Sequence, residues 1–410
     1  MKISKVSINL YFYILYVFIY FYILVKFFIY RNPIIQSNTL MYWILLTLSF
    51  ILTTKYAKKM NIGLKGLIFI GFYYAFFILC EILDILFGIS VWDQTERTSN
   101  CYDWLEQYLA EGYDSNYKMD YTESLFDDNF NLSITEATIN KYNYIFNELK
   151  IKPGMKVLDL GCGTGVWMSY CKERGVDVTG LTLSEEQAKV IRDKGFSNVY
   201  VQDYRNLNED FLDQFDRITL FGSTEHNCSF SGIYNVFGHD KNNNTCDNVR
   251  TDLFSLCKKY LKTNGMLYIC TLVINDDYEF SNYDLMQGYI MERHYGGRYS
   301  RFEKYVKSIE NADVEIVNIK DTTRDYHYCS IADPDYFGCW TVRWNENTVN
   351  KIVYLLKGIA TDPFLLHHWL YYGFDTWQWQ FGTTCGHKQP LTDEEIKNAP
   401  CLNKWYFCKV

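Results

Sequence analysis

The pattern of hydrophobic and polar residues divides the chain into an apolar N-terminal segment and a longer segment of mixed character. Residues 8–25 contain no charged side chain, and residues 32–54 form a second uncharged run. Each run is long enough to cross the roughly 30 Å hydrocarbon core of a bilayer. Neither resembles a secretory signal peptide, because the apolar runs are too long and no small-residue cleavage site follows. We therefore expect residues 1–92 to be a membrane anchor with two spanning helices.

A third apolar segment, residues 66–91, is interrupted by Glu81 and Asp84, so it either spans the bilayer or lies in the interface. The loop "KYAKKMNIGLK" is rich in lysine, and the positive-inside rule places it in the cytoplasm together with Lys2 and Lys5. Two spans with an interfacial third segment satisfy this rule. They predict an integral membrane protein whose remaining chain faces the cytoplasm.

After the apolar segment, strand-like and helix-like stretches alternate. Residues 93–150 form a connector and a lead-in helix, which a capping box at Ser133 and Glu136 should open. Within residues 151–410, short apolar runs separated by helical patterns predict parallel strands at 156–160, 176–183, 199–202, 217–221 and 266–273. The resulting fold class is α/β and Rossmann-like, with helices on both faces of the sheet.

The end of the chain has a different pattern. "VEIVNIKD" (residues 314–321) and "DTWQWQFG" (residues 375–382) alternate apolar and polar residues, which predicts antiparallel strands at a sheet edge. An insertion at about residues 275–311 should form a lid over the carboxyl ends of the parallel strands, where the substrate would bind.

Charge and cysteine content exclude several classes of function. Basic residues predominate in the first 92 residues, whereas the whole chain has a formal net charge of −8, so the remainder is acidic and a nucleic acid partner is not expected. The 13 cysteines are scattered and never spaced C-x-x-C, which argues against both a disulfide framework and a zinc ribbon. We expect no metal site. The alternative is an irregular zinc cluster of Cys385, His387, Cys401 and Cys408.

The sequence "VLDLGCGTG" runs from the first predicted strand into the turn after it and contains Asp159, Gly161, Gly163 and Gly165. Glycines allow a tight strand-to-helix turn and a close approach of backbone N–H groups to a ligand, while Asp159 can order the loop and meet the amine of the ligand. The G-x-G-x-G spacing is typical of S-adenosylmethionine sites. An acid that bonds ribose is usual about 20 residues later, yet the second strand ends in Thr-Leu-Ser within "VTGLTLSEEQ".

Together with "VQDYRNL" and "FDRITLFGSTEH", these motifs resemble the cyclopropane-fatty-acyl-phospholipid synthase family of class I methyltransferases, which includes the mycolic acid cyclopropane synthases. The likeness covers about residues 121–381. It implies a mixed seven-stranded sheet and an S-adenosylmethionine cofactor whose ribose meets Thr182 and Gln187 in place of an acid. The resemblance also assigns contacts to the methionine part, the adenine and the fourth strand, and the residues at these positions are Tyr121, Asp203, Tyr204 and Gly222.

In this family an alkene attacks the methyl group of the cofactor, and a bicarbonate held by Cys, Glu, His and Tyr takes the proton. Glu225 and Tyr328 match two of these positions, but Glu123 replaces the Cys and Cys270 replaces the His. A second carboxylate should disfavour a bound anion and raise the pKa of one member of the pair. We hypothesise that Glu123 is the proton acceptor and that Glu225 and Tyr328 orient it. A solvated Glu123 in a mobile lead-in is the alternative.

An N-terminal anchor joined to such a domain resembles the fungal sphingolipid methyltransferases. The resemblance predicts a methyltransferase that methylates or cyclopropanates an acyl or sphingoid double bond in a lipid drawn from the bilayer. The alternatives are an N- or O-methyltransferase acting on a lipid headgroup or small amine, and a membrane protein that binds the cofactor without catalysis. The sequence leaves the oligomeric state open.

Overall fold

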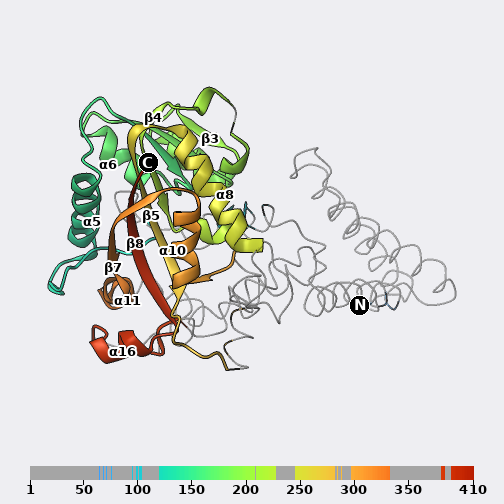
Figure 1. Ribbon diagram of the computed structural model, residues 1–410, viewed down its shortest axis with the longest axis vertical. Helices are drawn as coiled ribbons and strands as arrows, with labels where there is room; N and C mark the ends of the chain where they lie inside the picture. The colour runs from blue at the N-terminus through green and yellow to red at the C-terminus, as the bar shows by residue number, and fades with distance from the viewer. Residues whose placement is uncertain are drawn as a thin grey trace, which may run out of the picture. The chain divides into compact units, whose positions relative to one another are not determined.

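The computed structural model describes residues 120–207, 209–227, 245–281, 297–332, 380–383 and 389–410, with isolated positions before residue 104 and at 284 and 288 (Figure 1). The predicted spanning segments 8–25 and 32–54 lie outside the described residues, and the third apolar segment is described at only a few helical positions. Within the described part of the chain, no helix has the length and apolarity needed to cross a bilayer. The account below concerns the unit formed by Gln94–Phe230, Asn235–Asn347 and Leu370–Val410.

The lead-in helix α5 (Ile134–Glu148) begins where its capping box predicts. The Ser133 side chain accepts from the backbone N–H of Glu136, and the Glu136 carboxylate accepts from the backbone N–H of Ser133. This reciprocal pair satisfies two N–H groups that a helix start leaves without an intrahelical partner. The helix buries a face that includes Ile134, Ala137, Tyr142 and Ile145, so it packs as an amphipathic element.

The sheet confirms the predicted class I arrangement. Its strands run in the order β3-β2-β1-β4-β5-β8-β7, and a two-residue strand β6 pairs with β5. The first five in chain order are parallel, whereas β8 is antiparallel to both β5 and β7. Their bounds are β1 Lys156–Leu160, β2 Asp177–Thr182, β3 Val199–Val201, β4 Phe215–Phe221, β5 Leu261–Ile274, β6 Ser300–Arg301, β7 Glu315–Asp321 and β8 Cys401–Lys409.

The order of strands reverses between β1 and β4, because β2 and β3 lie on one side of β1 while β4 and β5 lie on the other. In open α/β sheets, ligands bind outside the carboxyl ends of the strands at such a switch point. The glycine loop follows β1 directly and therefore lies at this place.

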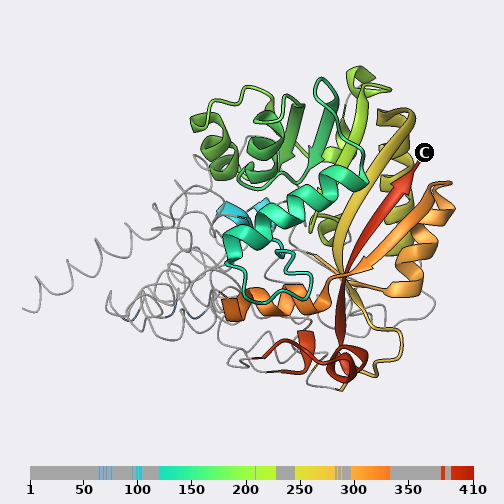
Figure 2. The same ribbon diagram turned by 90° about the vertical axis from the view of Figure 1, so that its left-hand side faces the viewer.

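Helices cover both faces of the sheet (Figure 2). One apolar core joins α5, α6 and α7 to the sheet through side chains such as Trp167, Met168 and Ile191, and the other joins α8 and α10 through side chains such as Phe254 and Tyr305. These helices and the remaining short ones are α6 Val166–Lys172, α7 Glu185–Asp193, α8 Thr245–Tyr260, α10 Phe302–Asn311, α11 Thr323–Ala332, α16 Asp393–Asn398, η1 Tyr204–Asn206, η2 Glu209–Phe211 and η3 Thr224–Asn227.

Two expectations from the sequence and one of its alternatives need correction. Gln380 and Phe381 of the predicted edge strand are helical, with the preceding part of that segment outside the described residues, and the antiparallel partner of β5 and β7 is β8. The predicted lid insertion, about residues 275–311, extends too far along the chain. Its last ten residues, 302–311, form α10, whose Tyr305 and Ile309 lie in the core. Cys401 and Cys408 lie at opposite ends of β8, roughly 23 Å apart at the rise of a strand, so one zinc ion cannot bind both.

Candidate active site

The glycine loop connects β1 to α6 with three residues in the left-handed region, Gly161, Gly163 and Gly165. At Gly161, which has φ +87°, a Cβ atom would lie 2.5 Å from the Cβ of Ser223, at the end of β4. The hydroxyl of Ser223 donates to the carbonyl of Leu160 over 2.7 Å, which fixes this approach. At Gly163 a Cβ atom would meet nothing within 4 Å, so the protein leaves space beside the loop where a ligand can lie.

Gly161→Ala should weaken binding of S-adenosylhomocysteine by roughly tenfold or more, because the added Cβ costs about 1–2 kcal/mol in this backbone conformation and also meets Ser223, so the loop that binds the cofactor must shift. Titration calorimetry measures the effect. Gly154→Ala is the matched control, since Gly154 has φ +82° and open space around it but lies before β1 and outside the loop. Equal loss of affinity in both variants would contradict the assigned role of Gly161.

Asp159 lies on β1 at the switch point. Its side chain is 1% exposed and its Oδ1 accepts from the hydroxyl of Thr219, which is its register partner on β4, over 2.8 Å. Burial raises the pKa of Asp159 to about 7. The carboxyl group thus ties the two central strands together directly below the loop, while its contact with a ligand amine stays a prediction.

The end of β2 brings together the two residues predicted to receive the ribose. Thr182 and Gln187 are both buried, and the Thr182 hydroxyl donates to Oε1 of Gln187 over 2.8 Å. The other end of that amide, Nε2, is buried and has no hydrogen-bond partner among the described residues. A buried amide left without a partner is costly, so this donor fits a site that a ligand hydroxyl completes.

Of the remaining predicted cofactor residues, Asp203 and Tyr204 follow β3, Gly222 follows β4 and Tyr121 precedes α5, and several of the side chains have protein partners. Asp203 accepts from the backbone and guanidinium of Arg205. The Tyr204 hydroxyl donates to the carbonyl of Ser223. Gly222 has φ +57° and its N–H donates to the carbonyl of Cys270 over 3.0 Å. Tyr121 is half-buried, with its ring centroid 6.4 Å from that of Tyr102.

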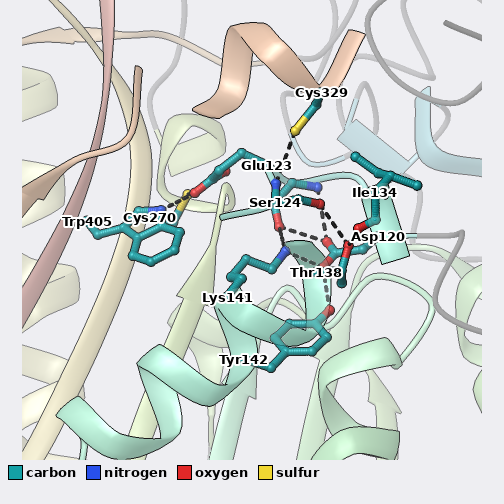
Figure 3. Close-up of polar contacts among 11 residues, drawn as sticks. Asp120, Glu123, Ser124, Ile134, Thr138, Lys141, Tyr142, Cys270, Cys329 and Trp405 are labelled. Carbon is teal, nitrogen blue, oxygen red and sulfur yellow. Dashed lines mark hydrogen bonds and ion pairs between the residues drawn. The ribbon is translucent and has the colours of Figure 1, made fainter. Parts of the chain in front are cut away.

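Glu123 lies in a buried cluster with Cys270 and Trp405 (Figure 3). It is 1% exposed, and its carboxylate accepts from the indole N–H of Trp405 and from the thiol of Cys270, whose Sγ lies 3.1 Å from Oε1 and 3.2 Å from Oε2. Cys270 and Trp405 are register partners on β5 and β8. The alternative of a solvated Glu123 is therefore wrong, and the carboxylate is held by two donors.

Glu225 follows β4 in η3 and is bound differently. Its Oε1 accepts from the backbone N–H of Leu272 over 3.1 Å, whereas its Oε2 is buried without a hydrogen-bond partner among the described residues. Burial is the main cause that raises the pKa of Glu225 to about 7. Hydrogen bonds from the Thr271 side chain and from backbone N–H groups offset part of the rise, and the charge of Glu123 adds to it. The predicted rise in one carboxyl of the pair is thus found at Glu225.

Tyr328 is not placed as predicted. Its hydroxyl donates to the carbonyl of Phe130 over 3.0 Å, and its ring packs against Phe126 and Phe130. The partners found for Glu123 are Trp405 and Cys270. Tyr328 therefore packs Phe126 and Phe130, which precede α5, against α11 and does not orient Glu123.

Sequence reasoning missed a buried cation beside the site, Lys141 of α5. Its side chain is fully buried, forms an ion pair with Asp120 and donates to the Thr122 hydroxyl over 2.9 Å. The Tyr142 hydroxyl also donates to Asp120. These bonds fasten residues 120–122 to α5, next to Glu123 (Figure 3). The burial of Lys141 could have been predicted from the sequence, because Lys141 lies four residues after Ala137 and four before Ile145, on the apolar face of the helix.

Comparison with known proteins gives one family. The family model for mycolic acid cyclopropane synthetase matches residues 91–332, more than half of the chain. A probable fatty acid methyltransferase of Mycobacterium tuberculosis is 42% identical over 115 residues, which are 26% of each chain. The cyclopropane-fatty-acyl-phospholipid synthase of Escherichia coli is 39% identical over 112 residues, 26% of this chain and 28% of that one. The chain thus spans about a quarter of the length of these relatives.

Solved structures support the fold. The cyclopropane synthase MmaA2 from Mycobacterium tuberculosis superimposes with a TM-score of 0.54 at 17% identity, covering 78% of this chain and 99% of that one. The mycolic acid cyclopropane synthase CmaA1, complexed with S-adenosylhomocysteine and CTAB, gives the same values.

Proposed function

The chain belongs to the mycolic acid cyclopropane synthetase family, and from this premise we propose that it transfers a methyl group from S-adenosylmethionine to a carbon of a lipid double bond. Membership makes it an S-adenosylmethionine-dependent methyltransferase of a lipid-modifying family. The proposal narrows the substrate to an acyl or sphingoid chain that contains an alkene.

The residues at the switch point fit the cofactor. Gly161 lets the loop pack closely on Ser223, Gly163 leaves open space beside the loop, and Nε2 of Gln187, which has no hydrogen-bond partner among the described residues, offers a donor for a ribose hydroxyl. When bound, S-adenosylmethionine supplies an electrophilic methyl group. The chain must then exclude water from the substrate and accept one proton, because addition of a methyl group to an alkene leaves a positive charge on the neighbouring carbon.

One observation carries the assignment of the proton acceptor: Oε2 of Glu225 is buried and has no hydrogen-bond partner among the described residues. Burial also raises the pKa of Glu225 to about 7. A general base works best when its pKa lies near the working pH and its lone pair is accessible to the proton. Glu123 meets the second condition poorly, because Trp405 and Cys270 already donate to it. The contacts thus favour Glu225 as the base, whereas the carboxylate of Glu123 is held in place by Trp405 and Cys270.

The reaction balances without a further reactant. The alkene forms a C–C bond to the methyl carbon, the S–CH₃ bond breaks, and the proton goes to Glu225. Loss of the proton from the transferred methyl group closes a cyclopropane, whereas loss from the chain restores an alkene that carries the methyl branch. A saturated branch would need a reductant and is not proposed.

The membrane anchor is part of the proposal and rests on the sequence. Residues 8–25 and 32–54 have the apolar length of spanning helices. An anchored enzyme could draw its lipid from the cytoplasmic leaflet, with the bilayer as its partner.

Expression of the full chain in cells fed methionine with a trideuterated methyl group tests the function. We expect lipid mass spectrometry to show label in an acyl or sphingoid chain. A cyclopropane retains two of the three deuterium atoms and a methyl-branched alkene retains all three. Label confined to headgroups, or absent despite measurable binding of S-adenosylhomocysteine, would reject the proposal in favour of N- or O-methylation or of a non-catalytic binding protein.

A further inference from the structure

The second strand lacks the usual ribose acid, but a carboxylate from elsewhere in the chain lies beside its end. Asp103 belongs to a helical stretch, residues 101–103. Its Oδ1 accepts from the hydroxyl of Ser184 over 2.6 Å and from the backbone N–H of Glu186 over 3.3 Å. Asp103 is thus bonded to the first turn of α7, the helix that carries Gln187.

These bonds continue into the pair that should receive the ribose. Ser184 Oγ accepts from the backbone N–H of Gln187 over 3.1 Å, and Ser184 N–H donates to the Thr182 hydroxyl over 3.1 Å. Thr182 in turn donates to Oε1 of Gln187. Because a carboxylate only accepts, the Ser184 hydroxyl must donate its hydrogen to Asp103. A lone pair of the Ser184 oxygen is then left to accept from the backbone N–H of Gln187.

We propose that Asp103 is a positioning residue for the cofactor: through Ser184 it fixes the first turn of α7, so that the buried Nε2 of Gln187 is directed to the ribose. Two observations independent of each other meet here, the Asp103 contacts and the buried amide without a partner among the described residues. Asp103 then takes the place of the acid in the ordinary motif, although it lies about 80 residues before the end of β2. It acts on the ribose site through Ser184 and Gln187 and does not itself bind the ribose.

The competing explanation is that Asp103 merely fastens its own segment. Other bonds fasten that segment as well: the Ser99 hydroxyl donates to the carbonyl of Leu183 over 2.9 Å, and Arg205 donates to the Thr95 hydroxyl over 3.0 Å. Ser99 therefore offers a matched control, because its bond reaches the same loop but does not enter the Thr182, Ser184 and Gln187 network.

Titration calorimetry of S-adenosylhomocysteine into the full chain in detergent tests the inference. We expect Asp103→Ala to weaken binding by about tenfold and Ser99→Ala by less than about threefold, on the scale of one hydrogen bond to a charged group against one neutral bond. Equal losses would overturn the inference. Ser184→Ala breaks the same link from the other side and serves if Asp103→Ala yields too little folded protein.

A double-mutant cycle provides a readout that a purely structural role would not move. If Asp103 acts through Gln187, Asp103→Ala should have little further effect on binding in a Gln187→Ala background. A full tenfold loss in that background would overturn the inference. The inference rests on the cofactor and not on the proposed lipid reaction, so binding data remain interpretable if no methylated lipid is found.

Discussion

Glu225→Gln should lower kcat by about 10²- to 10⁴-fold while leaving the affinity for S-adenosylhomocysteine within about twofold of the wild type. Glutamine retains an oxygen that can accept from Leu272 N–H, so the local structure should persist. It cannot take up a proton at neutral pH. Product formation from lipid vesicles by the full chain in detergent, quantified by mass spectrometry, measures the rate, and calorimetry measures the affinity.

The dependence of the wild-type rate on pH supplies the second arm of this test. Burial raises the pKa of Glu225 to about 7, and a base is active only when deprotonated. The rate should therefore fall as pH drops below about 7, approaching tenfold per pH unit, and level off above it. The residual rate of the Glu225→Gln variant should not fall in this way as the pH drops.

Glu123→Gln is the matched control, because it neutralises the other carboxylate of the pair and keeps an acceptor for Trp405 and Cys270. We expect a smaller loss of kcat, together with a lower apparent pKa in the pH profile, since the charge of Glu123 contributes to the raised pKa of Glu225. If Glu123→Gln removed turnover and Glu225→Gln did not, the assignment from the sequence would be right and the one from the contacts wrong.

Local signals in the sequence predicted much of the fold. The capping box at Ser133 and Glu136 marks the start of α5, and the apolar run before the glycine loop has the bounds of β1, Lys156–Leu160. Such features depend on neighbours within a few residues, so a single sequence contains them. The contact between Thr182 and Gln187 is of the same kind, since five positions separate them across one strand end and one helix start.

Features that depend on distant partners were not predicted. Strand β8 is buried along most of its length, so its sequence "CLNKWYFCK" shows little of the alternation by which an edge strand is recognised. The contact between Trp405 and Glu123 joins residues 282 positions apart. Asp103 and Ser184 are likewise brought together only by the fold, and nothing near Asp103 in the sequence indicates its bond to α7. The chemistry of the site is thus decided by tertiary contacts more than by the motifs that reveal the cofactor.

Lys141→Met should lower the free energy of unfolding by about 3–5 kcal/mol, because removal of one partner from a buried ion pair leaves the other charge without compensation. Lys141 is fully buried and Asp120 is 11% exposed, so water can screen the remaining carboxylate only in part. Tyr142 would still donate to it, but Thr122 would lose the ammonium. Chemical unfolding of the full chain in detergent, followed by tryptophan fluorescence, measures the change.

The double variant Lys141→Met with Asp120→Leu separates charge from packing. An apolar pair of similar volume often restores or exceeds the stability of a buried ion pair, so we expect the double variant to regain most of the lost stability. It should still fail to restore turnover, because residues 120–122, which precede Glu123, would no longer be held to α5 by the Lys141 bonds. Recovery of both stability and activity would show that the buried pair has no role in placing Tyr121 and Glu123, and that α5 holds the loop by apolar packing alone.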